Sequence, residues 1–272
     1  SNNTSDIDVR TMIHGYSPVV WDSQVEFVLD HMVVESVEGA ADGANTVYTV
    51  TLQDDLVYSD GETPITAADY VFSYLLCASD EVAQLGAQTR QYEHIVGYEE
   101  YASGESDVFT GVRLLDTYTY SITVKGSYEP FFYNYAYLRT NPYPISVIAP
   151  YCEVADDGDG AYLRSMDPEA EEVPFTVEVL TETIFDAETG YMSHPSLASG
   201  PYTLTAYDEG SGQVDFAINP YYKGNYEGVV PVIDTITLVP VLPETMIEQL
   251  QSGEIDLLNK CVDSDVILGG MA

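Results

Sequence analysis

Positively charged side chains are scarce in this chain. Its 272 residues include 8 Lys and Arg against 45 Asp and Glu, which gives a formal net charge of −37. Such a surface repels phosphate backbones and anionic lipids, so the charge argues against nucleic-acid binding. We interpret the excess as an acidic, solvated surface, with attraction of cationic ligands as the alternative. Hydrophobic residues make up 45% of the chain, which is normal for a folded globular protein.

Long apolar runs are absent, and cysteine is rare. No run approaches the roughly 18 apolar residues that a membrane-spanning helix requires. The opening stretch SNNTSDIDVR also lacks the apolar core of a signal peptide. The three cysteines, Cys77, Cys152 and Cys261, are widely spaced and form no CxxC motif. Because an odd count cannot pair fully, we expect three unpaired thiols, with one disulfide as the alternative.

Catalytic and metal-binding motifs are also missing. The chain has no HExxH, no GxSxG and no Walker loop, and its four histidines show no metal-ligand spacing. The sequence therefore predicts no enzyme activity, no cofactor and no metal site. With 45 acids, a pair of carboxylates of the glycosidase type could still form in space, but no motif selects two of them.

The acidic stretch at 153–163 has some features of a calcium loop. An EF-hand loop requires alternating acids, a central glycine and a glutamate at the twelfth position. Counted from Asp157, the twelfth residue is Pro168, and Ala161 stands where an acid is needed. We therefore favour a solvated acidic loop over a calcium site.

The most informative local pattern lies between residues 47 and 78. Residues 47–52 alternate between apolar and polar, which predicts a half-buried strand, and the sequence YSDGE then predicts a turn. Thr66 and Asp69 have the spacing of a capping box at the start of a helix. The following residues to position 78 are almost all apolar, so we expect this helix to be buried on nearly every side.

The rest of the chain mixes strands with a few helices. We expect a loop at 97–107, strands at 111–116 and 119–124, a short buried helix at 130–138, and extended chain at 142–150. Further on, we expect a hairpin from 200–207 and 213–220, a strand at 232–241, a helix from Pro243 to a cap at Gly253, and a strand at 254–258. This order predicts an α/β or mixed α+β protein.

Three blocks of sequence resemble one known family. The first block is residues 48–76, with its strand, SDGETPITAAD and VFS. The second is residues 111–137, a strand pair followed by a proline and an apolar segment. The third combines SGPYTLTAY and NPYYKGN in 199–225 with SGEID in 233–258. In order and spacing they resemble the family 5 extracellular solute-binding proteins, the oligopeptide- and dipeptide-binding receptors of ABC importers.

This resemblance implies a fold and a domain organisation. The expected fold is a periplasmic-binding-protein-like type II lobe, with mixed β-sheets flanked by helices, truncated before the second lobe. Residues 1–141 would form the peripheral subdomain of lobe one, without its opening strand and signal. Residues 142–260 would form the core subdomain, and residues 261–272 the start of the hinge crossing to the second lobe.

The resemblance also implies a function. The protein would capture a small solute, most readily a di- or oligopeptide, between two lobes and deliver it to the permease subunits of an ABC importer. Relatives also take nickel complexes, haem or sugars. The protein would act as a monomer at the extracellular face of the membrane, held by an N-terminal lipid anchor, or in the periplasm. The hinge positions Leu258, Asn259 and Lys260 would contact the ligand.

Two functions from other classes remain open. The first is an extracellular glycan-active enzyme that uses paired carboxylates. The second is a structural module of an acidic cell surface. Neither depends on a motif in the chain, and a glycan-cleavage assay and a ligand-induced closure measurement separate them from the binding protein.

Overall fold

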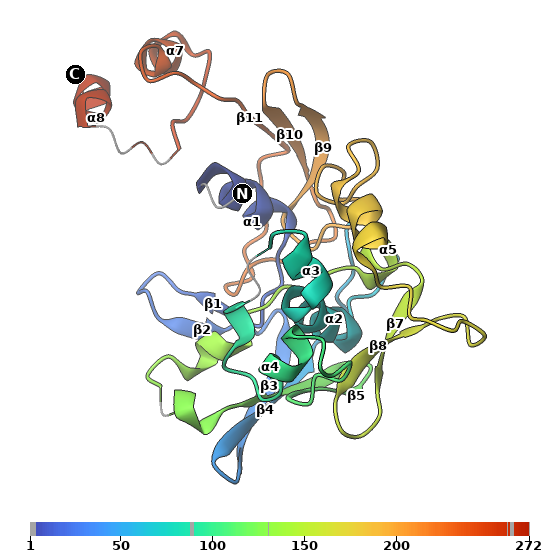
Figure 1. Cartoon of the computed structure of the whole chain (residues 1–272). Coiled ribbons are helices and arrows are strands. Elements are labelled where there is room, and N and C mark those ends of the chain that lie inside the picture. The colour runs from blue at the N-terminus through green and yellow to red at the C-terminus, as the bar shows by residue number, and fades with distance from the viewer. Residues whose placement is uncertain (1–3, 88–89, 130, 260, 262–263, 272) are drawn as a thin grey trace. The chain divides into compact units, whose positions relative to one another are not determined.

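The computed structural model describes residues 4–87, 90–129, 131–259, 261 and 264–271 (Figure 1). The chain divides into two compact units. The first comprises residues 1–204 and 217–234, and the second comprises residues 205–216 and 235–272. Helices and several antiparallel sheets are mixed along the chain, which confirms the predicted α/β class.

The strands of the described chain form four sheets, in the orders β3-β4-β6-β5, β1-β2, β7-β8 and β11-β10-β9. Their bounds are β1 Val19–Trp21, β2 Phe27–Leu29, β3 Val34–Asp42, β4 Asn45–Leu52, β5 Val112–Asp116, β6 Thr119–Val124, β7 Cys152–Asp156, β8 Ala161–Ser165, β9 Tyr202–Asp208, β10 Gln213–Ile218 and β11 Thr235–Leu238.

The longest α-helix among the described residues is α2, in the first unit. The α-helices are α1 Thr4–Ile13, α2 Ala67–Ala78, α3 Asp80–Gln84, α4 Tyr98–Ala102, α5 Ile145–Ile148, α6 Val177–Leu180, α7 Met246–Ser252 and α8 Ser264–Met271. Single turns of tighter or wider helix are η1 Arg90–Tyr92, η2 Gly126–Tyr128, η3 Asn134–Leu138 and η4 Thr181–Phe185. No helix within the described ranges has the length and apolar character needed to cross a membrane.

The core of the first unit lies between α2 and the four-stranded sheet. Strand β4 buries Tyr48, Val50 and Leu52 and leaves the intervening threonines half exposed, as the alternation predicts. Its neighbour β6 places Tyr120 opposite Val50 and buries it fully. Helix α2 packs against β5 and β6. The predicted strands at 47–52, 111–116 and 119–124 are therefore confirmed.

Helix α2 begins where the sequence predicts. Gly61 has a φ of 74° in the preceding turn, a backbone conformation that glycine adopts without a steric penalty. The carboxylate of Asp69 accepts hydrogen bonds from the backbone N–H of Thr66 at 2.8 Å and from its hydroxyl at 3.1 Å. Ser73, fully buried in the helix, donates to the carbonyl of Asn141 at 2.6 Å. The buried helix and its capping residues are confirmed.

Two predicted segments are helical where we expected a loop or extended chain. Residues 97–107 contain α4, because Gly97 starts a turn at φ 77° and Tyr101 stacks on Phe109 with ring centroids 5.1 Å apart. Residues 142–150 contain α5, which begins directly after Pro144, a position where proline's missing N–H costs little. Burial of these side chains outweighs the local polar and proline signals.

The prediction that the segment 130–138 is buried is wrong. Residues 134–138 form the 3₁₀ turn η3, with only Leu138 buried, whereas Phe132 is 87% exposed. Pro130 lies outside the described residues. The rings of Trp21 and Phe27, from β1 and β2, contact Tyr133, with ring centroids 6.0 Å and 5.6 Å from the Tyr133 centroid.

The acidic stretch and the last predicted strand also differ from expectation. Most of 153–163 belongs to the hairpin β7-β8, so only residues 157–160 form a loop. Residues 254–258 form no strand, because the chain folds back at Gly253 and the N–H of Ile255 donates to Gln249. The hairpin β9-β10 and the cap at Gly253 are as predicted, but α7 begins at Met246 rather than at Pro243.

Candidate functional site

The segment predicted to contact the ligand follows α7 in the second unit. Gly253 ends this helix in a left-handed conformation with φ 76°, and the chain then continues without regular structure. The side chain of Leu258 is half-buried, and that of Asn259 is exposed. Lys260 lies outside the described residues. Leu258 and Asn259 thus lie in irregular chain rather than at the end of a strand.

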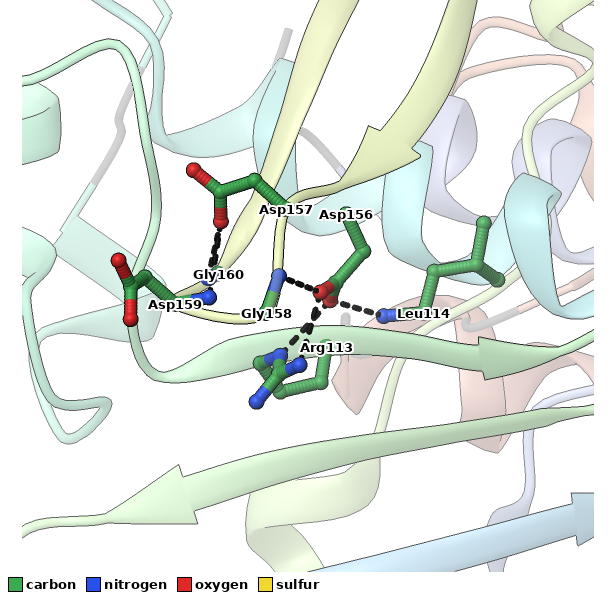
Figure 2. Close-up of polar contacts among 7 residues, drawn as sticks. All are labelled: Arg113, Leu114, Asp156, Asp157, Gly158, Asp159 and Gly160. Atoms are coloured by element: carbon green, nitrogen blue, oxygen red, sulfur yellow. Dashed lines mark hydrogen bonds and ion pairs between the residues drawn. The ribbon is translucent and has the colours of Figure 1, made fainter.

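The acidic hairpin loop of β7-β8 uses its carboxylates within the protein (Figure 2). The carboxylate of Asp156 accepts two hydrogen bonds from Arg113, both at 2.8 Å, and others from the N–H groups of Leu114 and Gly158. Asp157 accepts from the N–H groups of the two residues that end the loop. These bonds, led in strength by the ion pair, hold the pKa of Asp156 below its usual value despite partial burial.

The same loop does not form a metal centre among the described residues. No group of three or more His, Cys, Asp or Glu side chains in the described parts of the chain is arranged to hold a metal ion. Figure 2 shows that Asp156 points toward Arg113 and that Asp159 points away from both. These contacts indicate a charged hairpin whose Asp156 is bound to β5 by the ion pair with Arg113.

The cysteine side chains are free thiols. Burial raises the pKa of Cys77 to about 12 and that of Cys152 to about 11. Because the thiolate is the reactive form, both side chains are protonated and unreactive near neutral pH. Cys77 and Cys152 therefore act as small apolar packing groups.

A cavity of about 470 Å³ opens in the first unit. Its walls come from the end of α1, from residues 14–21, from residues 139–143 and from residues 222–226. The size lies within the range of about 300–1,000 Å³ that is typical of small-molecule sites. These segments are far apart in sequence, and no local motif predicts that they meet.

The backbone at the cavity is unusual at Tyr16. This residue has a φ of 59°, which is uncommon for a residue with a side chain. Its carbonyl accepts a hydrogen bond from the Tyr70 hydroxyl at 2.6 Å, and its own hydroxyl accepts from the N–H of Lys223 at 2.8 Å. The Tyr16 ring stacks on Tyr222 with centroids 5.1 Å apart. The surrounding contacts hold the strained backbone in place.

Titratable groups of both signs face this cavity. His14 lies four residues after Arg10 and also lines the cavity, and its Nδ1 atom is shielded from solvent with no hydrogen-bond partner among the described residues. Burial, aided by the charge of Arg10, lowers the pKa of His14 to about 4, so its ring is neutral at pH 7. Asp30 is only 4% exposed, and burial raises the pKa of its carboxyl.

The cavity does not contain the paired carboxylates of a glycosidase. Among the described residues the buried acids are Asp30 and Asp69, and only Asp30 lines the cavity. Asp69 is bonded to Thr66 at the start of α2. The sequence did not predict this site. The one available signal is the scarcity of basic residues, because two of the eight, Arg10 and Arg139, line the cavity.

Known proteins resemble this chain over most of its length. The family model described as bacterial extracellular solute-binding proteins, family 5 Middle, matches residues 32–268. The periplasmic oligopeptide-binding protein OppA of Escherichia coli (strain K12) is 25% identical over 215 residues, which are 78% of this chain and 32% of that protein. OppA of Salmonella typhimurium is 29% identical over 106 residues, which are 39% of this chain and 19% of the relative.

Solved structures give the same fold. Lactococcal OppA, complexed with an endogenous peptide in the closed conformation, aligns with a TM-score of 0.67 at 20% identity, over 98% of this chain and 43% of that one. Peptide-bound OppA of Listeria monocytogenes aligns with a TM-score of 0.66 at 16% identity, over 94% of this chain and 42% of that one. The chain thus spans less than half the length of the structures it matches.

Proposed function

This chain belongs to family 5 of the bacterial extracellular solute-binding proteins, and on that premise we propose that it forms part of the substrate-binding component of an ABC importer. The substrate we propose is a di- or oligopeptide, captured between two lobes and passed to the permease subunits. The family match over residues 32–268 carries this proposal. The oligopeptide-binding relative of Escherichia coli and the peptide-bound lactococcal structure support peptide as the ligand class.

The finer assignments belong to the same proposal. The chain would act by binding rather than by catalysis, as a monomer outside the cytoplasmic membrane, either lipid-anchored or periplasmic. Residues 1–141 would form the peripheral subdomain and residues 142–260 the core subdomain of lobe one. Leu258 and Asn259 would contact the peptide, because they follow the SGEID sequence at which the family's chains cross between lobes.

Peptide capture by a protein that carries this chain together with a second lobe tests the proposal. We expect a mixed peptide pool to raise its melting temperature and to reduce its radius of gyration in small-angle scattering, because hinge closure compacts the two lobes. Mass spectrometry of the co-purified ligand would identify the peptide. A protein that neither closes nor gains stability with any peptide, and that cleaves a glycan instead, would refute the importer function.

A matched pair of variants tests the hinge residues separately. Asn259→Ala is expected to weaken peptide binding by about tenfold, the effect of losing a hydrogen bond to a charged or backbone group. Gln251→Ala removes a similar amide from the exposed surface of α7 and should leave binding unchanged. Equal affinity of the two variants would remove Asn259 from the site without affecting the proposal of peptide import.

A further inference from the structure

The basic side chains of this acidic chain differ in whether they pair with an acid. The structure describes the side chains of six of them, and four of these pair with acids: Arg113 with Asp156, Lys125 with Glu99, Arg164 with Glu153, and Lys223 with Asp55. The other two are Arg10 and Arg139, which have no acidic partner among the described side chains. Both line the same cavity in the first unit.

The position of Arg10 is directed toward the cavity. Burial, with a smaller contribution from the charge of Arg10, lowers the pKa of His14, and the same charge acts on the hydroxyl of Tyr143; both of these rings line the cavity. The rings of His14 and Tyr143 meet edge to face with centroids 5.2 Å apart. Arg10 therefore lines the cavity together with these two rings.

Arg139 is positioned by aromatic rings. Its guanidinium carbon lies 5.6 Å from the ring centroid of Phe27, within the range of a cation–π contact. Phe27 in turn stacks on Trp21, with centroids 3.7 Å apart, and Trp21 lines the cavity. A cation–π contact orients the guanidinium but leaves its N–H donors available for an anion.

The remaining walls suit a small ligand with an apolar body. Tyr222 and Tyr16 present stacked rings, and the strained backbone of Tyr16 is held by two hydrogen bonds. Asp30, the one buried acid at the cavity, uses a carboxylate oxygen to accept from the N–H of Met32 at 2.9 Å. Its negative charge would oppose an anion nearby but would attract an ammonium group on the same ligand.

We propose that this cavity binds a small organic carboxylate with an aromatic or apolar body, the carboxylate accepting hydrogen bonds from Arg10 and Arg139 and the body lying against Trp21 and Tyr222. Arginine is suited to this task because its planar fork of donors matches a carboxylate. In a chain with 45 acids, two guanidinium groups that line one cavity and have no acidic partner among the described side chains mark a place that favours a negative ligand.

Isothermal titration of the 272-residue chain with three matched compounds tests this inference. The compounds are 3-phenylpropanoate, L-phenylalanine and 2-phenylethylamine, which carry a carboxylate alone, both charged groups, and an ammonium alone. We expect the two carboxylates to bind and the amine not to bind. Either order of affinity between the carboxylates supports the site, and a preference for phenylalanine assigns the ammonium to Asp30.

Charge-matched variants locate the binding. The double variant Arg10→Gln with Arg139→Gln is expected to weaken 3-phenylpropanoate binding by at least about tenfold, because charge-assisted hydrogen bonds are lost. Arg164→Gln removes an exposed basic residue away from the cavity and should keep the affinity. Both arginines at the cavity are exposed, so the variants should fold, and circular dichroism checks this.

Three results would contradict the proposal, and none of them bears on peptide import. Equal binding by the double variant and the unsubstituted chain, preferential binding of the amine, or no binding of either carboxylate at millimolar concentration would overturn the proposal. The assay contains no peptide and requires no second lobe. Its failure would therefore leave the peptide-import function standing, and failure of peptide import would leave this cavity's ligand unaffected.

Discussion

Replacing Asp69 with Asn tests what the buried acid at the start of α2 costs the protein. This carboxylate is 6% exposed and accepts two hydrogen bonds from Thr66. Burial raises its pKa from 3.8 to about 6, against the opposing effect of those bonds. Because the folded state holds the proton more tightly than the unfolded state, stability falls as the pH rises from about 4 through about 6.

The size of the effect follows from proton linkage between pH 5 and pH 8. With pKa values of 3.8 unfolded and about 6 folded, ionisation of Asp69 lowers the free energy of unfolding by about 2 kcal/mol at pH 5 and about 3 kcal/mol at pH 8. The protein should therefore lose about 1 kcal/mol across this range through Asp69 alone. In the Asp69→Asn variant this loss is absent.

Urea unfolding of both proteins at pH 5, 6, 7 and 8 measures the difference. The amide keeps one acceptor for the Thr66 N–H but buries a new N–H₂ group, a cost that does not depend on pH. We expect the variant to gain about 1 kcal/mol relative to the parent between pH 5 and pH 8. Asp54→Asn, at an exposed acid, is the control. Parallel pH curves for the parent and Asp69→Asn would refute the reasoning.

Three further predictions concern the cap, the buried histidines and the charged hairpin. Thr66→Ala should lower the free energy of unfolding by about 0.5–2 kcal/mol, and an unchanged urea midpoint would contradict the cap. His14 and His94 both have pKa values lowered to about 4, chiefly by burial, so their ring protons should titrate near pH 4 in NMR spectra, and stability should fall as the pH drops from about 6.5 through 4. A midpoint near 6.5 would show that the rings are solvated. Arg113→Gln should cost about 1–3 kcal/mol in denaturant unfolding by leaving Asp156 without its ion pair, and Asp156→Asn in the same protein should recover part of that loss.

The sequence predicts structure well where neighbouring residues carry the signal. The strand at 47–52 is defined by its own alternation, and α2 by an N-cap, an acid three residues later and a continuous apolar run. The hairpin at 200–218 is defined by two alternating runs around a glycine-rich turn. Each of these signals lies within about a dozen residues, so tertiary contacts reinforce it rather than decide it.

Prediction fails where distant partners decide the outcome. The composition of the acidic stretch at 153–163 indicates a solvated loop, yet pairing of β7 with β8 and the bond from Arg113 make most of the stretch a hairpin. The aromatic run at 131–138 indicates burial, but the rings of β1 and β2 contact Tyr133, and Phe132 is left in solvent. Composition cannot show which neighbours a side chain will have.

Because the chain is so acidic, a basic residue without an acidic partner indicates a place where a negative ligand can bind. Composition alone does not show which basic residues these are. A net charge of −37 makes an acidic neighbour easy to find on the surface, and Lys125 and Lys223 illustrate this with partners distant in sequence. Arg10 and Arg139 are exceptions, because they have no acidic partner among the described side chains. Arg10 comes from α1 and Arg139 follows η3, so only the folded chain shows that the two share one cavity. The count of basic residues could be read from the sequence, but which of them remain available to a ligand is decided by tertiary structure.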